Sequence, residues 1–124
     1  DVFGDREIKA KCILPPYPRK MGTYIPKAVR KNVCELKSID FTDKYKDSHT
    51  AIALQTIKDA EIKEIFVTGY DAYKGEITLR EQELYNENQF LFQKYKYTQL
   101  KYMISLTPTA YDELETTSVY AVIK

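Results

Sequence analysis

The chain has 124 residues, of which 44% are hydrophobic and 30% are charged, a composition that is ordinary for a globular protein and argues against long disordered segments. Its formal net charge of +1 provides no global field that would favour nucleic acid or an anionic membrane. No apolar run approaches the roughly 20 residues that span a bilayer. We therefore expect one globular domain, with no nucleic-acid partner and no membrane partner.

The cysteine and histidine content argues against a metal site. Two cysteines and one histidine cannot complete the usual zinc ligand sets. A disulfide between Cys12 and Cys34 is not favoured, and we expect both to be small buried hydrophobic residues. The low cysteine count and the lack of a signal segment predict a cytoplasmic protein.

Residues 1–40 predict a partly irregular N-terminal arm. Residues 8–14 are a candidate strand that ends at a proline-rich stretch, because proline lacks a backbone donor. Residues 32–36 are a second, weaker strand candidate. The polar residues 40–48 suit a loop.

Residues 41–124 predict a core of alternating strands and helices. Asp47 and Ser48 can cap a helix that runs to about Ala60. On this helix we expect Thr50, Ala53, Leu54 and Ile57 on one face, with Ile52 off that face and burial on two sides. Residues 64–68 read Glu-Ile-Phe-Val-Thr, which is typical of a strand because β-branched and aromatic residues fit a pleated surface.

A long helix is predicted over residues 79–100, which contain neither glycine nor proline. One broad face of it carries Leu84, Tyr85, Asn88, Leu91, Phe92 and Tyr95. Residues 102–106 predict another short strand, and residues 118–123 a last one. A strand, a crossover helix and a strand in this order predict parallel pairing. The predicted fold class is a three-layer Rossmann-like α/β sandwich with a mainly parallel sheet.

The predicted binding site lies beyond the carboxyl ends of the strands, where loops meet helix N-termini. The strand that ends at Thr68 places the following loop at this edge, with Thr107 nearby if the next strand is a neighbour. The helix that feeds this strand must begin on the same edge. The expected ligand-binding crevice consists of Ser48, His49, Thr50, Gly69, Asp71 and Tyr73.

Each part of this crevice also has a simpler structural interpretation. Ser48 at a helix start can help to hold a phosphate or carboxylate, or it can only cap the helix. Asp71 can accept hydrogen bonds from a sugar hydroxyl, or it can cap its own turn. No nucleophile is placed beside His49, so we predict no catalytic residue in this chain.

Two further motifs are attributed to chance or to structure. Asp5-Arg6-Glu7 has the letters of a metal-binding motif of TIM-barrel lyases, but 124 residues cannot build a barrel of about 250 residues. Residues 94–102 interleave lysines and tyrosines, as single-strand nucleic-acid binders do. Lysines at a helix C-terminus explain that pattern more simply.

Longer stretches resemble the C-terminal region of bacterial aldolase-like proteins, whose N-terminal TIM barrel is similar to 4-hydroxy-2-oxovalerate aldolase and HMG-CoA lyase. The resemblance rests on residues 42–54, 63–73, 83–92, 104–109 and 118–123. Glycines that are usual in this family are replaced by Glu61, at the helix end, and by Ala72. Because alanine disfavours a positive φ, we expect Ala72 to restrict the loop that follows Gly69.

The resemblance implies that this chain is the C-terminal piece of a longer protein. Retro-aldol or Claisen-type C–C lyase chemistry, with its Mn²⁺ or Mg²⁺, would belong to the absent barrel, and this domain would need no cofactor. The expected function is a non-catalytic accessory or interaction domain, with the barrel of the same polypeptide as its partner and a homo-oligomer left open. The 11 tyrosines favour such a role, because tyrosine suits half-apolar surfaces.

An alternative rests on a helix followed by a strand and a Gly-x-Asp sequence. This pattern is similar to that of Rossmann-like bacterial sialyltransferases and related nucleotide-sugar binders. It implies a sugar-nucleotide site at the Gly69 loop.

Overall fold

The computed structural model shows a mixed α/β protein in which all paired strands are parallel. It describes residues 9–16, 25, 27–72, 75–101 and 103–123. Contacts divide the chain into two compact units, residues 1–56 and residues 57–124. The predicted α/β class with parallel strands is confirmed. The third layer of the sandwich and the single domain stay predictions.

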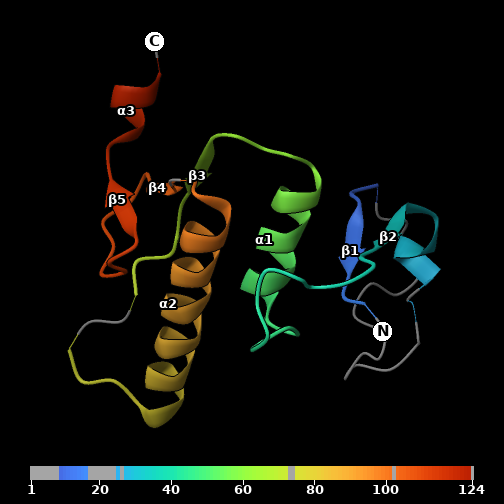
Figure 1. The fold of residues 1–124 in the computed structure, drawn as a ribbon, viewed down its shortest axis with the longest axis horizontal. Helices are drawn as coiled ribbons and strands as arrows, with labels where there is room; N and C mark the ends of the chain where they lie inside the picture. Colours follow the sequence, from blue (N-terminus) through green and yellow to red (C-terminus); the bar gives the residue numbers. More distant parts are fainter. Residues whose placement is uncertain (1–8, 17–24, 26, 73–74, 102, 124) are drawn as a thin grey trace. The chain divides into compact units, whose positions relative to one another are not determined.

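The first unit contains a two-stranded parallel sheet. Strand β1 (Cys12–Leu14) pairs with β2 (Val33–Glu35), which follows the 3-10 helix η1 (Lys27–Asn32) (Figure 1). Both strands lie within the stretches predicted for them, although Ile8, where the first stretch begins, lies outside the described residues.

The two cysteines are free and stand on opposite faces of this sheet. Cys12 is aligned with Val33 and Cys34 with Ile13, so the cysteines are one residue out of register. Neighbouring side chains along a strand alternate between faces, which explains the absence of a disulfide in this pairing. The expectation that both cysteines are buried was wrong, because Cys34 is exposed and Cys12 is only half-buried.

Helix α1 (His49–Asp59) begins and ends close to the predicted positions. The helix is buried on two sides, as Ile52 suggested, through Thr50, Ala51, Ile52, Leu54 and Gln55. Ala53 is exposed rather than part of the buried stripe. The buried amide of Gln55 is satisfied, because its Oε1 accepts a hydrogen bond of 2.9 Å from the backbone N–H of Asp40. This bond anchors the loop that precedes the helix.

The second unit is built on a three-stranded parallel sheet of order β3-β4-β5. Strands β3 (Ile65–Val67) and β4 (Met103–Ser105) were predicted and are neighbours, as the crossover argument required. Strand β5 (Leu114–Thr116) was not predicted. It pairs with β4 after a connection, residues 106–113, that is shorter than the dozen or so residues usual between parallel strands.

Helix α2 (Leu79–Gln99) is the long helix that the sequence predicted, and its N-terminus is capped. The hydroxyl of Thr78 accepts a hydrogen bond of 3.1 Å from the backbone N–H of Glu81, in the Thr-x-x-Glu arrangement of a capping box. The predicted apolar face contributes three buried side chains, those of Leu91, Phe92 and Tyr95. These residues form the core of this unit together with Ile65, Met103, Tyr111 and Leu114.

Polar contacts fix α2 against the connection between β4 and β5. Asn88, the polar member of the predicted stripe, donates a hydrogen bond of 3.3 Å from Nδ2 to the hydroxyl of Tyr111. Nearer the helix C-terminus, Lys96 forms a partly buried ion pair of 3.2 Å with Glu113. Lys96 therefore has a structural role, whereas the complementing of the helix C-terminus by its lysines stays a prediction.

The last predicted strand, residues 118–123, is wrong. These residues form the short helix α3 (Val119–Val122), whose cap Ser118 accepts a hydrogen bond of 3.3 Å from Ala121 N–H. The ladder ends just before it, where Thr117 N–H donates to Ser105 O at 2.9 Å. A serine beyond the last paired residue favours a helix start because its side chain satisfies a free donor of the first turn.

Candidate functional site

The loop after β3 and the loop after β4 meet at the carboxyl edge of the sheet. Thr107 Oγ1 accepts a hydrogen bond of 3.2 Å from Gly69 N–H and donates one of 2.7 Å to Asp71 Oδ1. The sequence-based expectation that Thr107 lies near Gly69 and Asp71 is thus confirmed. Gly69 and Asp71 are exposed, so this edge presents a carboxylate and a hydroxyl to solvent.

A second set of contacts holds the same loops together. Thr109 Oγ1 donates to Tyr70 O, and Ala110 N–H donates to Asp71 O at 3.2 Å. The ring of Tyr70 packs edge-on against Phe92 of α2, with centroids 5.1 Å apart. Tyr70 therefore takes part in the aromatic core. Tyr73, the last residue predicted for the crevice, lies outside the described residues.

Ala72 and Glu61 both adopt a positive φ, of 66° and 56° respectively. The expectation that alanine would restrict the Gly69 loop was therefore wrong, because Ala72 takes the left-handed conformation anyway. Such a conformation costs an L-residue roughly 1–2 kcal/mol. These are the two positions at which the resemblance expected glycine, the residue that adopts this conformation without strain.

The other three predicted crevice residues begin α1, in the first unit. Ser48 Oγ accepts from the backbone N–H groups of Thr50 and Ala51, at 3.1 and 3.4 Å, and so acts as the helix cap. Thr50 is 5% exposed, whereas His49 is exposed. Gly69 and Asp71 belong to the second unit. The convergence of these two groups in one crevice stays a prediction.

Residues 9–16, 25, 27–72, 75–101 and 103–123 contain no cluster of three or more His, Cys, Asp and Glu side chains arranged to hold a metal ion. No helix within these ranges combines the length and the apolar character needed to cross a membrane.

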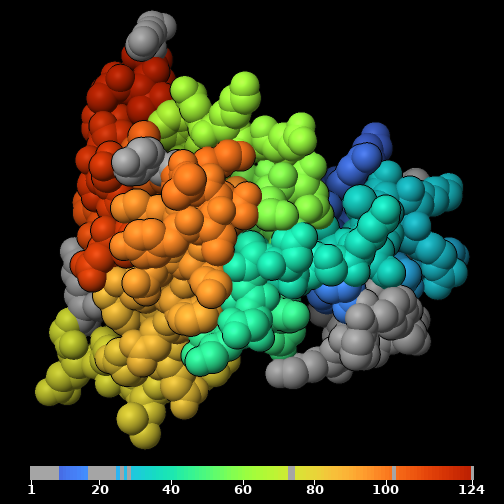
Figure 2. All heavy atoms as spheres, viewed as in Figure 1, coloured from blue at the N-terminus to red at the C-terminus, as the bar shows by residue number. Residues whose placement is uncertain are grey.

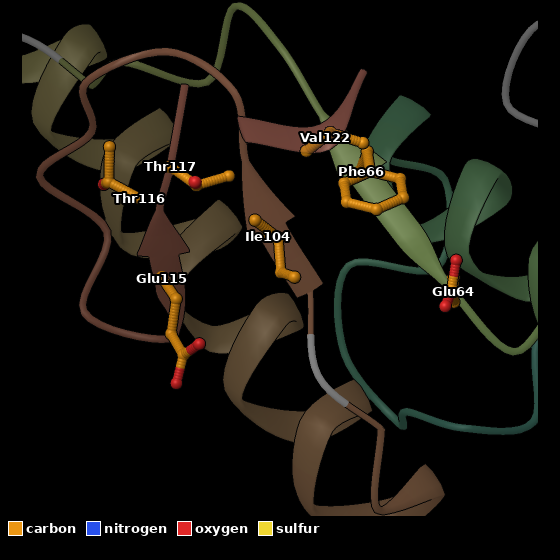
Figure 3. A pocket seen from close by; sticks show the side chains of 7 residues that line it. All are labelled: Glu64, Phe66, Ile104, Glu115, Thr116, Thr117 and Val122. Atoms are coloured by element: carbon orange, nitrogen blue, oxygen red, sulfur yellow. The ribbon is translucent and has the colours of Figure 1, made fainter. Parts of the chain in front are cut away.

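A feature that the sequence analysis missed is the uncovered face of the β3-β4-β5 sheet. Phe66, Ile104 and Glu115 are aligned side by side on this face, one on each strand. Ile65, Met103 and Leu114, which each precede one of these residues, point to the opposite face and are buried. Figure 3 shows the three aligned side chains on the near face of the sheet, with α2 behind it. We call the surface formed by Glu64, Phe66, Ile104, Glu115 and Val122 the open face.

The open face is hollowed in two adjoining places. The large hollow has a volume of about 560 Å³. Its lining consists of Glu64, Phe66, Ile104, Glu115, Thr116, Thr117 and Val122. The small hollow, of about 270 Å³, is also lined by Lys63, Leu100 and Lys101. Glu64, Phe66 and Ile104 line both, so the two hollows form one continuous depression.

Apolar side chains border this depression without being buried. Phe66 is 40% exposed and Leu100, at the end of α2, is 85% exposed. No residue of α3 is buried, and Val122 of this helix lies beside Phe66 in Figure 3. Figure 2 shows the C-terminal residues, in red, at the surface of the second unit. The exposed apolar residues of this segment are Val119, Tyr120, Val122 and Ile123.

The sequence did carry one signal of the open face. A parallel sheet normally has both faces covered by helices, yet the second unit offers only one long helix, α2, for three strands. The run Glu64 to Thr68 was interpreted simply as a strand, because its amino acids do not show which face remains uncovered.

Comparisons of the chain with protein-family models, curated proteins and solved structures gave no significant match. The family resemblance is therefore a proposal.

Proposed function

We propose that this chain is a non-catalytic interaction domain that docks on another protein through the open face. The observation that carries this proposal is that Phe66 is exposed and Ile104 only half-buried on one face of an all-parallel sheet. Parallel sheets occur almost only with both faces covered. A partner that covers this face would remove the apolar surface of both side chains from water.

The size and composition of the open face support a protein partner. The apolar residues of the sheet, of α3 and of the end of α2 adjoin the two hollows. Contiguous exposed apolar patches with a polar rim mark interaction sites in soluble proteins. Each square ångström of apolar surface that such a partner covers contributes about 25 cal/mol before the cost of association is subtracted.

The partner we propose is the TIM-barrel domain of an aldolase-like protein, of which this chain would be the C-terminal accessory domain. This proposal rests on the sequence resemblance. It is supported by the positive φ of Glu61 and Ala72, the two positions at which the resembling proteins have glycine. Any C–C lyase chemistry and its Mn²⁺ or Mg²⁺ then belong to the barrel.

The test is calorimetric titration of this chain with a TIM-barrel protein of the 4-hydroxy-2-oxovalerate aldolase class. We expect micromolar binding that Phe66→Lys weakens at least tenfold, because the apolar surface of the Phe66 ring is lost from the contact. Leu79→Lys is the matched control, since Leu79 is 86% exposed at the start of α2 and outside both hollows. No binding, or equal loss in both variants, would contradict the proposal.

A second candidate function is nucleotide-sugar binding, which the position of Asp71 and Thr107 at the carboxyl ends of β3 and β4 favours. Calorimetry with cytidine and uridine nucleotides tests it, with Asp71→Ala as the site variant and Asp43→Ala as the control. Tight binding that only Asp71→Ala weakens would establish this function in place of the interaction domain.

A further inference from the structure

The charges on the open face are unevenly distributed. The large hollow is lined by two carboxylates, those of Glu64 and Glu115, and by no basic residue. Neither carboxylate forms an ion pair or a hydrogen bond with the part of the chain that the structure describes. In the small hollow the ammonium group of Lys101 donates to Ile62 O at 2.8 Å. The large hollow thus combines the apolar side chains of Phe66, Ile104 and Val122 with two threonines and two carboxylates, and the carboxylates are available to a partner.

The sheet geometry fixes how far apart these carboxylates stand. Glu115 is aligned with Phe66 across two strand spacings, and Glu64 lies two residues before Phe66 on the same side of β3. With strands about 4.8 Å apart and a rise of about 3.3 Å per residue, the two backbone positions are roughly 12 Å apart. Figure 3 shows the two carboxylates on either side of Ile104.

From this arrangement we infer that the open face binds an amphipathic α-helix of a partner protein, with two basic residues placed seven or eight positions apart. This inference rests on the proposed function and specifies its partner. A helix is the element that covers the face of a parallel sheet. Because it rises about 1.5 Å per residue, two cations about 12 Å apart are separated by seven or eight residues. Lysine and arginine can lay their apolar stems over Phe66 and Ile104 while reaching the carboxylates.

A second copy of this chain fits the face less well. The apolar faces of α1 and of α2 are largely buried. The exposed apolar residues of α2, Leu79 and Tyr97, stand at opposite ends of that helix, so neither helix offers a free apolar stripe. Sedimentation of the chain alone should therefore give a monomer. A dimer that Phe66→Lys dissociates would overturn the inference.

The test uses three labelled 18-residue helical peptides with the same leucine stripe. The first carries two lysines eight positions apart, the second carries glutamates at the same positions, and the third carries the two lysines two positions apart. Binding to the full chain is measured by fluorescence anisotropy at low and high salt. The protein variants are Glu64→Gln, Glu115→Gln, the double variant, and Phe66→Lys. Glu76→Gln is the control, because Glu76 is exposed and lines neither hollow.

We expect the first peptide to bind at least tenfold more tightly than the other two. Each glutamine variant should weaken its binding about threefold and the double variant about tenfold, as for exposed ion pairs. Added salt should reduce the preference, and Glu76→Gln should leave it unchanged. Equal binding of all peptides, abolished by Phe66→Lys, would overturn this inference while leaving the docking surface intact. A preference for the first peptide that survives in the double variant would also overturn the inference, and so would the absence of any peptide binding. The proposed function itself is decided only by the titration with the TIM-barrel protein.

Discussion

The hydroxyl of Thr107 lies 2.7 Å from Asp71 Oδ1, although the two residues are 36 positions apart in the chain. The contact joins the loops at the carboxyl ends of β3 and β4, and Gly69 N–H donates to the same hydroxyl. One side chain thus satisfies a backbone donor and holds a carboxylate.

Thr107→Val should lower the free energy of unfolding by about 1–2 kcal/mol, because two hydrogen bonds of modest net value are lost. Urea denaturation measures this change. Thr68→Val is the matched control, since Thr68 is exposed and should lose almost nothing. In a double-mutant cycle with Asp71→Ala the two losses should not add. Additive losses would contradict a direct Thr107–Asp71 contact.

Ala72→Gly should raise the free energy of unfolding by about 1 kcal/mol, because φ at this position is 66° and glycine adopts that conformation without strain. Glu61→Gly, at a φ of 56°, should act in the same direction. Ala53→Gly, on the exposed side of α1, should instead destabilise by about 1 kcal/mol. Thermal or urea unfolding of the three variants checks these signs, and a loss in Ala72→Gly would refute the left-handed conformation.

Burial raises the pKa of the Tyr95 hydroxyl above its usual value, an effect that the positive charge of Lys58 only partly offsets. The hydroxyl of Tyr95 therefore keeps its proton to a higher pH in the folded state than in the unfolded state. Its contribution to the free energy of unfolding is fully present below about pH 10 and is lost as the pH rises through the folded-state pKa. Tyr95→Phe should therefore reduce the alkaline loss of stability. Urea unfolding at neutral and alkaline pH measures it, with the largely exposed Tyr97→Phe as the control. An equal effect of both variants would rule out a special role for Tyr95.

The chain alone should not cleave 4-hydroxy-2-oxo acids in the presence of Mn²⁺ or Mg²⁺, because the residues that the structure describes include no cluster of side chains arranged to hold the metal ion. A coupled assay for pyruvate release checks this expectation. Metal-dependent turnover by the purified chain that is abolished by chelation would show that the catalytic function does not require a separate barrel.

The sequence by itself determined the elements whose signals are local. The cap at Ser48 and the apolar stripe of α2 are properties of residues within a few positions of one another, and both helices lie close to their predicted bounds. The strands β3 and β4 were also predictable, because β-branched and aromatic runs flank a helix of crossover length. From this order the proximity of Thr107 to the Gly69 loop followed.

Only the tertiary structure decided which surfaces remain uncovered. Strand β5 reads Leu-Glu-Thr, with no apolar run to mark it, and becomes a strand by pairing with β4. The apolar residues near the C-terminus predicted a strand but form a helix that is not buried. The predicted three-layer sandwich would bury Phe66 and Ile104, yet burial depends on what packs above a strand face. That is a property of distant parts of the chain, or of a partner, and it is why the open face could not be located from the sequence of the strand itself.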